Sequence, residues 1–229
     1  MTETNLIVAF FGALFALANP FGNLPFFISY TSNLRAGVQK ATAFLLTIFL
    51  IIFYLLFFFV GNDILAFFGI SIPAFEIAGG IIVMIIALSM VSGEHTEKQK
   101  EVMQIKEKET GKETLEENIE EAESFLPSVL VPLGIPIYAG PGALSVVVIY
   151  GEKSMQTSGF AVIASIAVII GICLIVCIVN FLAAPINRFL GAQGLEILVR
   201  IMGLILAAIA VTLLIEGMAA ISTIFVAPS

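Results

Sequence analysis

The stretch "ALANPFGNLPFF", Ala16 to Phe27, interrupts a long apolar run near the start of the chain with two prolines, a glycine and two asparagines. Proline lacks a backbone donor and clashes with the carbonyl one turn earlier, so it bends or ends a helix. In lipid, backbone groups without hydrogen bonds are tolerated only where protein buries them or where they line a cavity. If lipid surrounds this stretch, its break predicts a cavity.

Composition indicates that lipid does surround it. The chain has 229 residues, of which 59% are hydrophobic and 12% charged, and its mean hydropathy is +1.09. A helix needs about 20 apolar residues to cross about 30 Å of hydrocarbon. Six apolar runs are near this length or longer, roughly residues 6–30, 41–60, 64–91, 126–150, 159–184 and 195–226. The start "MTETN" has no basic region, so the first run is expected to be a retained helix. We therefore predict an all-α integral membrane protein with six transmembrane helices.

The ten basic residues predict the orientation of these helices, because cytoplasmic loops retain Lys and Arg. Nine of them follow the first, third or fifth run, and Lys153 alone lies on the other side. This distribution places both termini outside and the first, third and fifth connections in the cytoplasm.

The connection after the third run is the one extended hydrophilic segment, residues 93–124. Its eleven glutamates and five lysines give it a net charge of −6, out of −7 for the chain. We interpret it as a solvated, partly helical or disordered connector, in preference to a regulatory or partner-binding segment. His95, the single histidine, lies here without Cys or His neighbours, and Cys173 and Cys177 are one helical turn apart in an apolar run. No nucleotide, zinc or serine-hydrolase motif occurs. We expect neither an enzyme nor a cofactor, a metal or a nucleic-acid partner.

Internal repetition divides the chain into two halves. Residues 62–87 resemble residues 184–210 at offsets of 122 and 124, and Pro20 matches Pro141 at an offset of 121. The other matches are Ile64 with Ile186, Phe67 with Phe189, Gly69 with Gly191, Glu76 with Arg200, Ile77 with Ile201, and Gly79 with Gly203. Halves with three spans each cross the membrane in opposite senses. We predict two inverted three-helix repeats, residues 1–92 and 126–229, joined by an acidic linker, residues 93–125.

The fourth run carries a matching interruption, "PLGIPIYAGPG", so the first and fourth helices are predicted to be discontinuous. Paired breaks in corresponding places indicate a binding site at the middle of the membrane, although prolines and glycines could serve packing alone. Broken helices present free carbonyls and free amides with partial charges of about −0.5 and +0.5. Since neither break contains an acidic or basic residue, this lining suits a zwitterion with no net charge. The candidate substrate-binding residues are Asn19, Pro20, Gly22, Asn23, Pro25, Tyr138, Ala139, Gly140, Pro141, Gly142, Ala143 and Ser145.

The stretches "NPFGNLPFF", "VPLGIPIYAGPGALSVVVI", "IAGGIIV" and "RIMGLILAAIAV" resemble the MarC family of prokaryotic membrane proteins. The resemblance covers all six runs, although the long acidic insertion departs from the compact loop expected for the family. It implies an inverted-repeat transporter of the cytoplasmic membrane, with glycine, alanine and serine as the class of substrate. The motif residues carry over as Asn19, Pro20, Gly22, Pro25, Pro132, Pro136, Gly140, Pro141 and Gly142.

Glu76 and Glu216 are the candidates for coupling to protons or another cation, because buried carboxylates carry protons in many transporters. We favour the alternative that both lie at the membrane interface. Arg200 is expected to be a cytoplasmic anchor, far from Glu76. Two other functions are open: a passive channel or a scaffold that does not transport, and an exporter of drug-like amphiphiles. The sequence does not indicate the direction of transport or the oligomeric state.

Overall fold

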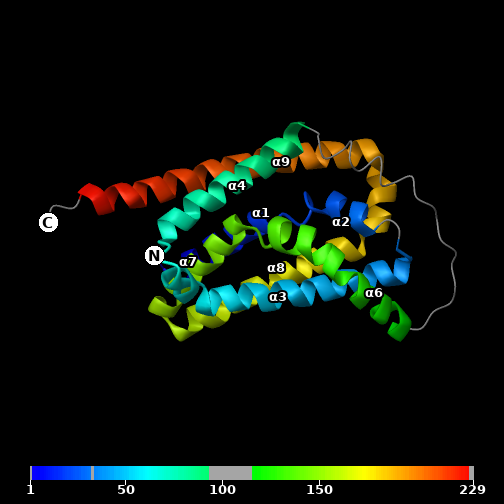
Figure 1. The fold of residues 1–229 in the computed structure, drawn as a ribbon, viewed down its shortest axis with the longest axis horizontal. Coiled ribbons are helices and arrows are strands. Elements are labelled where there is room, and N and C mark those ends of the chain that lie inside the picture. The colour runs from blue at the N-terminus through cyan, green and yellow to red at the C-terminus, as the bar shows by residue number, and fades with distance from the viewer. Residues whose placement is uncertain (1, 32–33, 93–114, 227–229) are drawn as a thin grey trace.

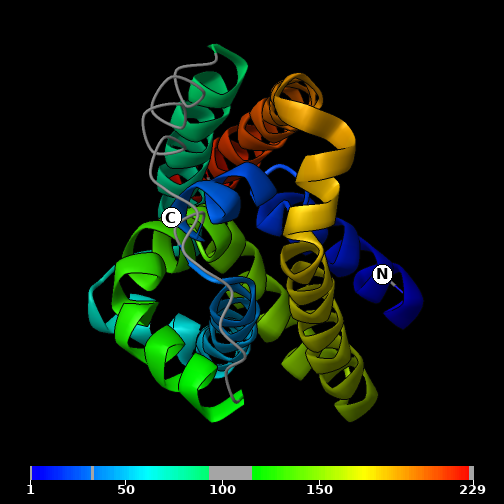
Figure 2. The same cartoon turned by 90° about the vertical axis from the view of Figure 1, so that its right-hand side faces the viewer.

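The computed structural model describes residues 2–31, 34–92 and 115–226, and every regular element in these ranges is a helix. The helices lie in three layers (Figure 1), with α4 and α9 on one side, α1, α2 and α7 in the middle, and α3, α6 and α8 on the other. The end-on view shows the same order (Figure 2). The elements are α1 (Glu3–Ala18), α2 (Leu24–Thr31), α3 (Ala36–Phe67), α4 (Ile72–Ser92), α6 (Leu115–Val129), the π-helix η1 (Leu130–Tyr138), α7 (Pro141–Thr157), α8 (Gly159–Phe181) and α9 (Ala183–Val226).

Four of the described helices are long and apolar enough to cross a membrane: α3, α4, α8 and the part of α9 from Glu196 to Ile221. No more than 33% of the residues in their most apolar windows are buried by protein. Their outward faces carry large exposed side chains such as Ile52, Ile85 and Ile163, as lipid contact requires. The first and fourth apolar runs are instead divided into shorter helices.

The turn between the second and third runs lies later than predicted. Residues 61–63 were expected to separate the runs, but α3 continues through them to Phe67. Gly69 makes the turn with a φ of 69°, and the Ile70 N–H donates to the Leu65 carbonyl at 2.8 Å, as at many helix ends. Gly61 has a packing role, because a Cβ there would lie 2.3 Å from Val148 Cγ2 of α7.

The helix α9 begins before the predicted sixth run and bends at Gly191, whose φ of 64° and ψ of 178° are not helical. Gly191 and Gly69, which match in the predicted repeat, are the glycines with positive φ among the described residues. Each precedes a long membrane-spanning segment. Only glycine adopts such a backbone without steric cost, so both matched positions require the same residue.

Glycines also allow α4 and α9 to pack backbone to backbone. A Cβ on Gly80 would lie 3.1 Å from the Ala210 carbonyl oxygen, and one on Gly203 would lie 3.1 Å from that of Ala87. The order of these pairs along the chain shows that the two helices run antiparallel, side by side as in Figure 1. Small residues at such contacts are typical of helix packing in membranes.

The last part of the predicted linker, residues 93–125, is structured. The helix α6 begins at Leu115, and Ala122 packs against Val38 and Ala41 of α3. Residues 93–114, which include His95, lie outside the described residues. The described end of the linker is therefore helical, within the expectation of a partly helical connector, and its apolar face packs against α3.

Polar contacts join the elements at both ends of the bundle. Ser158, which separates α7 from α8, accepts a hydrogen bond from the Ala161 N–H at 3.1 Å and donates one to Glu3 of α1. At the opposite end, Arg35 forms an ion pair with Glu121 of α6. The start of α1 and the end of α9 both lie at the end of the bundle where α7 is followed by α8 (Figure 1).

Candidate functional site

The first break begins at Asn19, whose φ of 43° and ψ of 59° place it in the left-handed region. Asparagine tolerates this conformation better than most residues. Its side-chain oxygen Oδ1 accepts a hydrogen bond from the Gly22 N–H at 3.1 Å. A Cβ on Gly22 would lie 2.3 Å from Asn19 Nδ2, so the turn needs glycine at this position. Pro20 and Pro25, also predicted site residues, are buried around the turn.

Asn23 closes the end of α1. Its Nδ2 donates to the Ala18 carbonyl at 2.9 Å, while its backbone carbonyl accepts from the Phe26 N–H at 3.1 Å at the start of α2. The Ala18 carbonyl, one of those expected to be free at this helix end, therefore already accepts one hydrogen bond. Asn23 Oδ1 has no hydrogen-bond partner within the described residues.

The amide nitrogen of Asn19 is a buried donor without an acceptor. Asn19 is 3% exposed, and its Nδ2 has no partner among the described residues. The orientation of the Asn19 amide is determined by the Gly22 N–H, because this donor requires Oδ1, and not Nδ2, to face it. Leaving a buried donor unsatisfied costs about 1–3 kcal/mol, so each such group in a native protein calls for an explanation, such as a functional role or a bound water.

The second break is narrower than predicted, because Pro132 and Pro136 lie inside η1 and the interruption is limited to Ala139 and Gly140. Proline nitrogens cannot donate, and the chain takes the wider π-helical turn here. The Ala139 N–H, for example, donates to the Gly134 carbonyl five residues earlier at 2.8 Å.

The helix α7 starts in this break without a side-chain cap. Pro141 is its first residue and Gly140 its N-cap, so the N-cap has no side chain to accept from the first amides. Gly142 and Ala143, both buried, follow in the first turn. An uncapped N-terminus carries a partial charge of about +0.5 and attracts anions. This buried helix end therefore favours a negatively charged ligand group.

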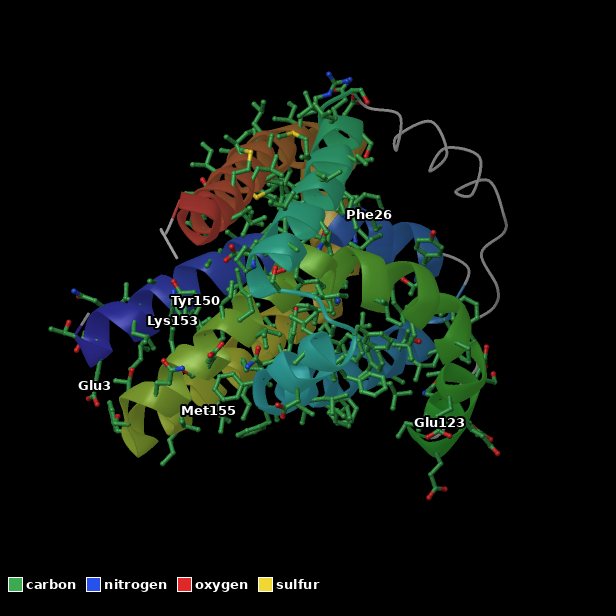
Figure 3. The ribbon with its side chains drawn as sticks, turned by 60° about the vertical axis from the view of Figure 1, so that its left-hand side comes forward. Glu3, Phe26, Glu123, Tyr150, Lys153 and Met155 are labelled. Carbon is green, nitrogen blue, oxygen red and sulfur yellow. The ribbon has the colours of Figure 1, made fainter. Side chains whose placement is uncertain are left out.

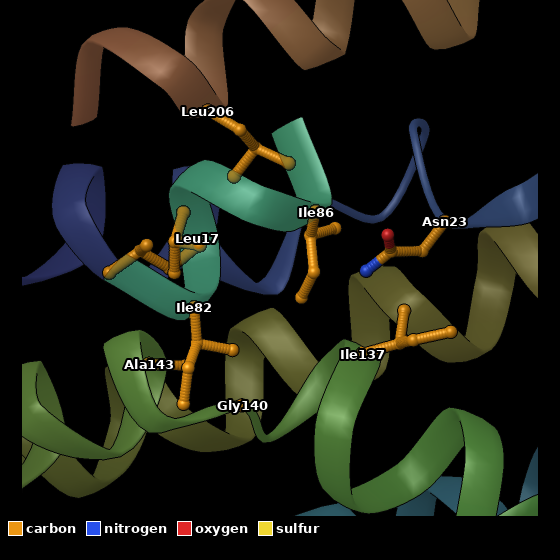
Figure 4. A pocket seen from close by; sticks show the side chains of 9 residues that line it. Leu17, Asn23, Ile82, Ile86, Ile137, Gly140, Ala143 and Leu206 are labelled. Atoms are coloured by element: carbon orange, nitrogen blue, oxygen red, sulfur yellow. The ribbon is translucent and has the colours of Figure 1, made fainter. Parts of the chain in front are cut away.

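A small cavity lies between the two breaks (Figure 4). Its volume is about 20 Å³, which holds a water molecule but not an amino acid. Figure 4 shows the Asn23 amide at one side and Gly140 and Ala143 below it, with apolar side chains around the rest. The lining residues are Leu17, Asn23, Ile82, Val83, Ile86, Ile137, Gly140, Ala143 and Leu206. The structure is thus closed at the breaks.

An apolar barrier separates this cavity from a larger one. A Cβ on Gly142 would lie 2.6 Å from Val83 Cγ2, 3.4 Å from Leu17 Cδ2 and 3.5 Å from Leu213 Cδ1. Val83 lines the small cavity, Leu213 lines the large one, and Leu17 lines both. Gly142 is therefore packed into the wall between the two spaces and has no room for a side chain.

The larger cavity, which we call the vestibule, has a volume of about 350 Å³ and lies between α1, α4, α7 and α9. It brings together Glu76 and Glu216, which were predicted only as separate candidates. Tyr150 and Lys153 of α7 also line it, and Figure 3 shows both beside α1 at the end where the chain begins. The vestibule is lined by Gly12, Ala13, Ala16, Leu17, Glu76, Val146, Ile149, Tyr150, Lys153, Ile209, Thr212, Leu213 and Glu216.

Two predicted site residues, Tyr138 and Ser145, line neither cavity and bond to protein groups. The Tyr138 hydroxyl donates to Asn180 Oδ1 at 3.0 Å, and the Tyr138 carbonyl accepts from the Tyr54 hydroxyl at 2.6 Å. Ser145 Oγ donates to the Phe75 carbonyl at 3.3 Å. Tyr138 thereby joins η1 to α3 and α8, and Ser145 joins α7 to α4.

Sequence reasoning missed the residues that α4 contributes to the small cavity. Ile82, Val83 and Ile86 are isoleucines and valine like those that face lipid, so no local pattern distinguishes them. Lys153 had a signal, because it was the single basic residue on its side of the membrane. Cys173 and Cys177 are free thiols, and Cys173 is buried in the core.

Long apolar helices and a buried pair of helix breaks define an integral membrane protein. The chain belongs to the MarC family of integral membrane proteins, whose model matches residues 4–222. It is similar to "UPF0056 membrane protein YhcE" of Escherichia coli strain K12, with 36% identity over 91% of this chain and 89% of the relative. A "UPF0056 membrane protein" of Buchnera aphidicola subsp. Schizaphis graminum is 35% identical over 96% of this chain and 95% of its own length. An archaeal relative in Methanocaldococcus jannaschii, also a "UPF0056 membrane protein", is 36% identical over 90% of this chain and 93% of its own length. No solved structure matches the chain.

Proposed function

We propose that this protein is a secondary transporter of small neutral amino acids in the prokaryotic cytoplasmic membrane. The observation that carries the proposal is the buried Asn19 amide, a donor with no acceptor among the described residues, in one of two helix breaks. A substrate carboxylate is the acceptor that this group and the uncapped start of α7 both favour.

The lining of the small cavity limits the chemistry of the substrate. No acidic or basic residue lines it, so a ligand with a net charge would be desolvated without compensation. Asn23 Oδ1 is an available acceptor for the ammonium group of a zwitterion. Gly140 and Ala143 let the ligand approach the backbone closely. A small zwitterion fits these conditions better than a drug-like amphiphile.

The transport cycle we propose is alternating access between two inverted halves, residues 1–92 and 126–229, each with three spans. The shared positive φ of Gly69 and Gly191 supports this repeat, and the barrier of Leu17, Val83 and Leu213 supports a gate on the vestibule side. Opening of this barrier would connect the breaks to the vestibule. By the distribution of basic residues the vestibule faces outward, with both termini outside.

The resemblance of the break motifs to those of SnatA, the small neutral amino acid transporter of the MarC family, agrees with this proposal. The residues that carry the resemblance are those that form the breaks, N-P-x-G-x-x-P at residues 19–25 and G-P-G at residues 140–142. The family's motifs therefore coincide with the site that the geometry indicates.

Uptake of radiolabelled glycine into proteoliposomes tests the function. A carrier saturates with glycine and shows counterflow from vesicles preloaded with unlabelled alanine, whereas a passive channel does neither. An imposed proton gradient tests coupling. Well-folded protein without any flux would indicate a scaffold, and flux of amphiphilic drugs without glycine flux would indicate an exporter.

A further inference from the structure

The vestibule contains charges of both signs, contributed by both halves of the chain. Glu76 comes from α4, Lys153 from α7 and Glu216 from α9. The two acidic residues lie close together across the contact between α4 and α9, since a Cβ on Gly217, next to Glu216, would lie 3.3 Å from Glu76 Cβ. The proposed transport site does not use any of these groups.

Glu76, Lys153 and Glu216 form no ion pair with one another in the part of the chain that the structure describes. Within the described residues, neither glutamate makes an ion pair or a hydrogen bond, although Glu76 is only 8% exposed. The Lys153 Nζ lies over the Tyr150 ring, 5.3 Å from its centre, and is not paired with a carboxylate. A buried charge without a partner is costly. A cavity lined by two carboxyl groups and one ammonium group that form no ion pair with one another therefore favours a ligand with groups of both signs.

We propose that the vestibule is a second binding site for the amino acid zwitterion. The Glu76 and Glu216 carboxylates accept from its ammonium group, and Lys153 donates to its carboxylate. The inference rests on the proposed function for the identity of the ligand. It goes further because it assigns a separate, charged site on the other side of the barrier of Leu17, Val83 and Leu213. Substrate would bind there before or after it passes the breaks.

The charges decide between a zwitterion and simpler ions. A simple cation would satisfy the glutamates but leave Lys153 without a partner, and a simple anion would pair with Lys153 but be repelled by the two glutamates. A zwitterion leaves no ligand charge unmatched. The volume of about 350 Å³ lies within the usual range of small-molecule sites, so the vestibule admits amino acids larger than glycine.

Equilibrium binding of radiolabelled glycine to the purified full chain tests this site. Binding is measured in the wild type and in an Asn19→Asp background, which disables the proposed central site. In both backgrounds Glu76→Gln and Lys153→Met should each weaken the vestibule component at least about tenfold, the loss of one charged hydrogen bond. Glu152→Gln is the matched control, because Glu152 precedes Lys153 on α7 but is absent from the vestibule lining.

Two ligand analogues separate the zwitterion from its parts. Glycine ethyl ester retains only the ammonium, so its binding should depend on Glu76 and not fall with Lys153→Met. N-acetylglycine retains only the carboxylate and should depend on Lys153. An ester that binds as tightly as glycine, or glycine binding unchanged in both variants, would overturn the proposal. If Glu76→Gln does not fold, Glu216→Gln takes its place.

The same variants distinguish this inference from the proposed function. If flux is saturable and normal, and glycine binding is unchanged in Glu76→Gln and Lys153→Met, the vestibule site is refuted but the transporter function is not. Absence of flux, together with zwitterion binding that depends on both charges, would support the vestibule site and refute the transporter.

Discussion

Replacing Asn19 by aspartate changes a single group at the first break. One carboxylate oxygen of the variant can still accept from the Gly22 N–H, the bond that closes the turn at 3.1 Å. Aspartate also tolerates the left-handed backbone at this position. The substitution replaces only the unpartnered Nδ2 donor with a negatively charged oxygen. The turn should therefore form in Asn19→Asp, but the variant buries a carboxyl group, so its folding has to be measured before its affinity is interpreted.

The expected loss of affinity follows from the bond that is removed. A hydrogen bond to a charged group contributes about 1.5–3 kcal/mol, which corresponds to roughly 10- to 100-fold in affinity at 1.4 kcal/mol per tenfold. Repulsion between the new carboxylate and that of the substrate adds to this loss. We expect the glycine concentration at half-saturation to rise at least about tenfold, from the lost hydrogen bond alone. With the added repulsion, the rise should be nearer a hundredfold.

Half-saturation for glycine uptake into proteoliposomes measures this effect. Asn62→Asp makes the same chemical change at an exposed position of α3, and its half-saturation should equal that of the wild type. Thermal unfolding of both variants in detergent shows whether the protein is intact. Wild-type half-saturation in a well-folded Asn19→Asp protein would refute a substrate carboxylate at Asn19.

Three further predictions concern packing and topology. Gly142→Ala places a Cβ 2.6 Å from Val83 Cγ2 and should destabilise the protein by about 1–3 kcal/mol, measured as a lower thermal midpoint. Adding Val83→Ala to this variant should restore much of the lost stability. If the destabilisation in the double variant equals the sum of the two single effects, the clash lies elsewhere. Tyr54→Phe leaves the buried Tyr138 carbonyl without its 2.6 Å donor and should cost about 1–3 kcal/mol, so an unchanged denaturation midpoint would contradict it. A cysteine in place of Met155 at the vestibule end should react with a membrane-impermeant maleimide in intact cells, and labelling only after lysis would reverse the proposed orientation.

Local chemistry made the break at Asn19 predictable, because proline and glycine restrict the backbone whatever surrounds them. The partners of the broken ends were not predictable in the same way. Asn23 was expected to bind substrate, and its Nδ2 instead donates to the Ala18 carbonyl at the end of α1. Tyr138 was expected to face substrate, yet Asn180 and Tyr54, distant in the chain, occupy its polar groups. A side chain's partners depend on elements that the sequence pattern does not place.

The boundaries between elements also depend partly on local sequence and partly on tertiary packing. Gly61 and Gly69 are both glycines near the end of α3, but one packs against Val148 and the other turns the chain. Only the packing of α7 against α3 decides which glycine does which. In α6, inside an acidic segment, Ile119, Ala122 and Leu126 recur at helical spacing, but only the structure shows that this apolar face packs against α3.

The sequence by itself determined that this protein lies in a membrane, that its helices break at Asn19 and near Gly140, and that it belongs with proteins carrying the same motifs. These properties follow from hydropathy and backbone stereochemistry, which act over short stretches of chain. The tertiary structure alone decided that the Asn19 amide is left without a partner, that Leu17, Val83 and Leu213 close around Gly142, and that Glu76, Lys153 and Glu216 share one cavity. Those properties arise between residues far apart in sequence, where burial and proximity, not local pattern, set the energy.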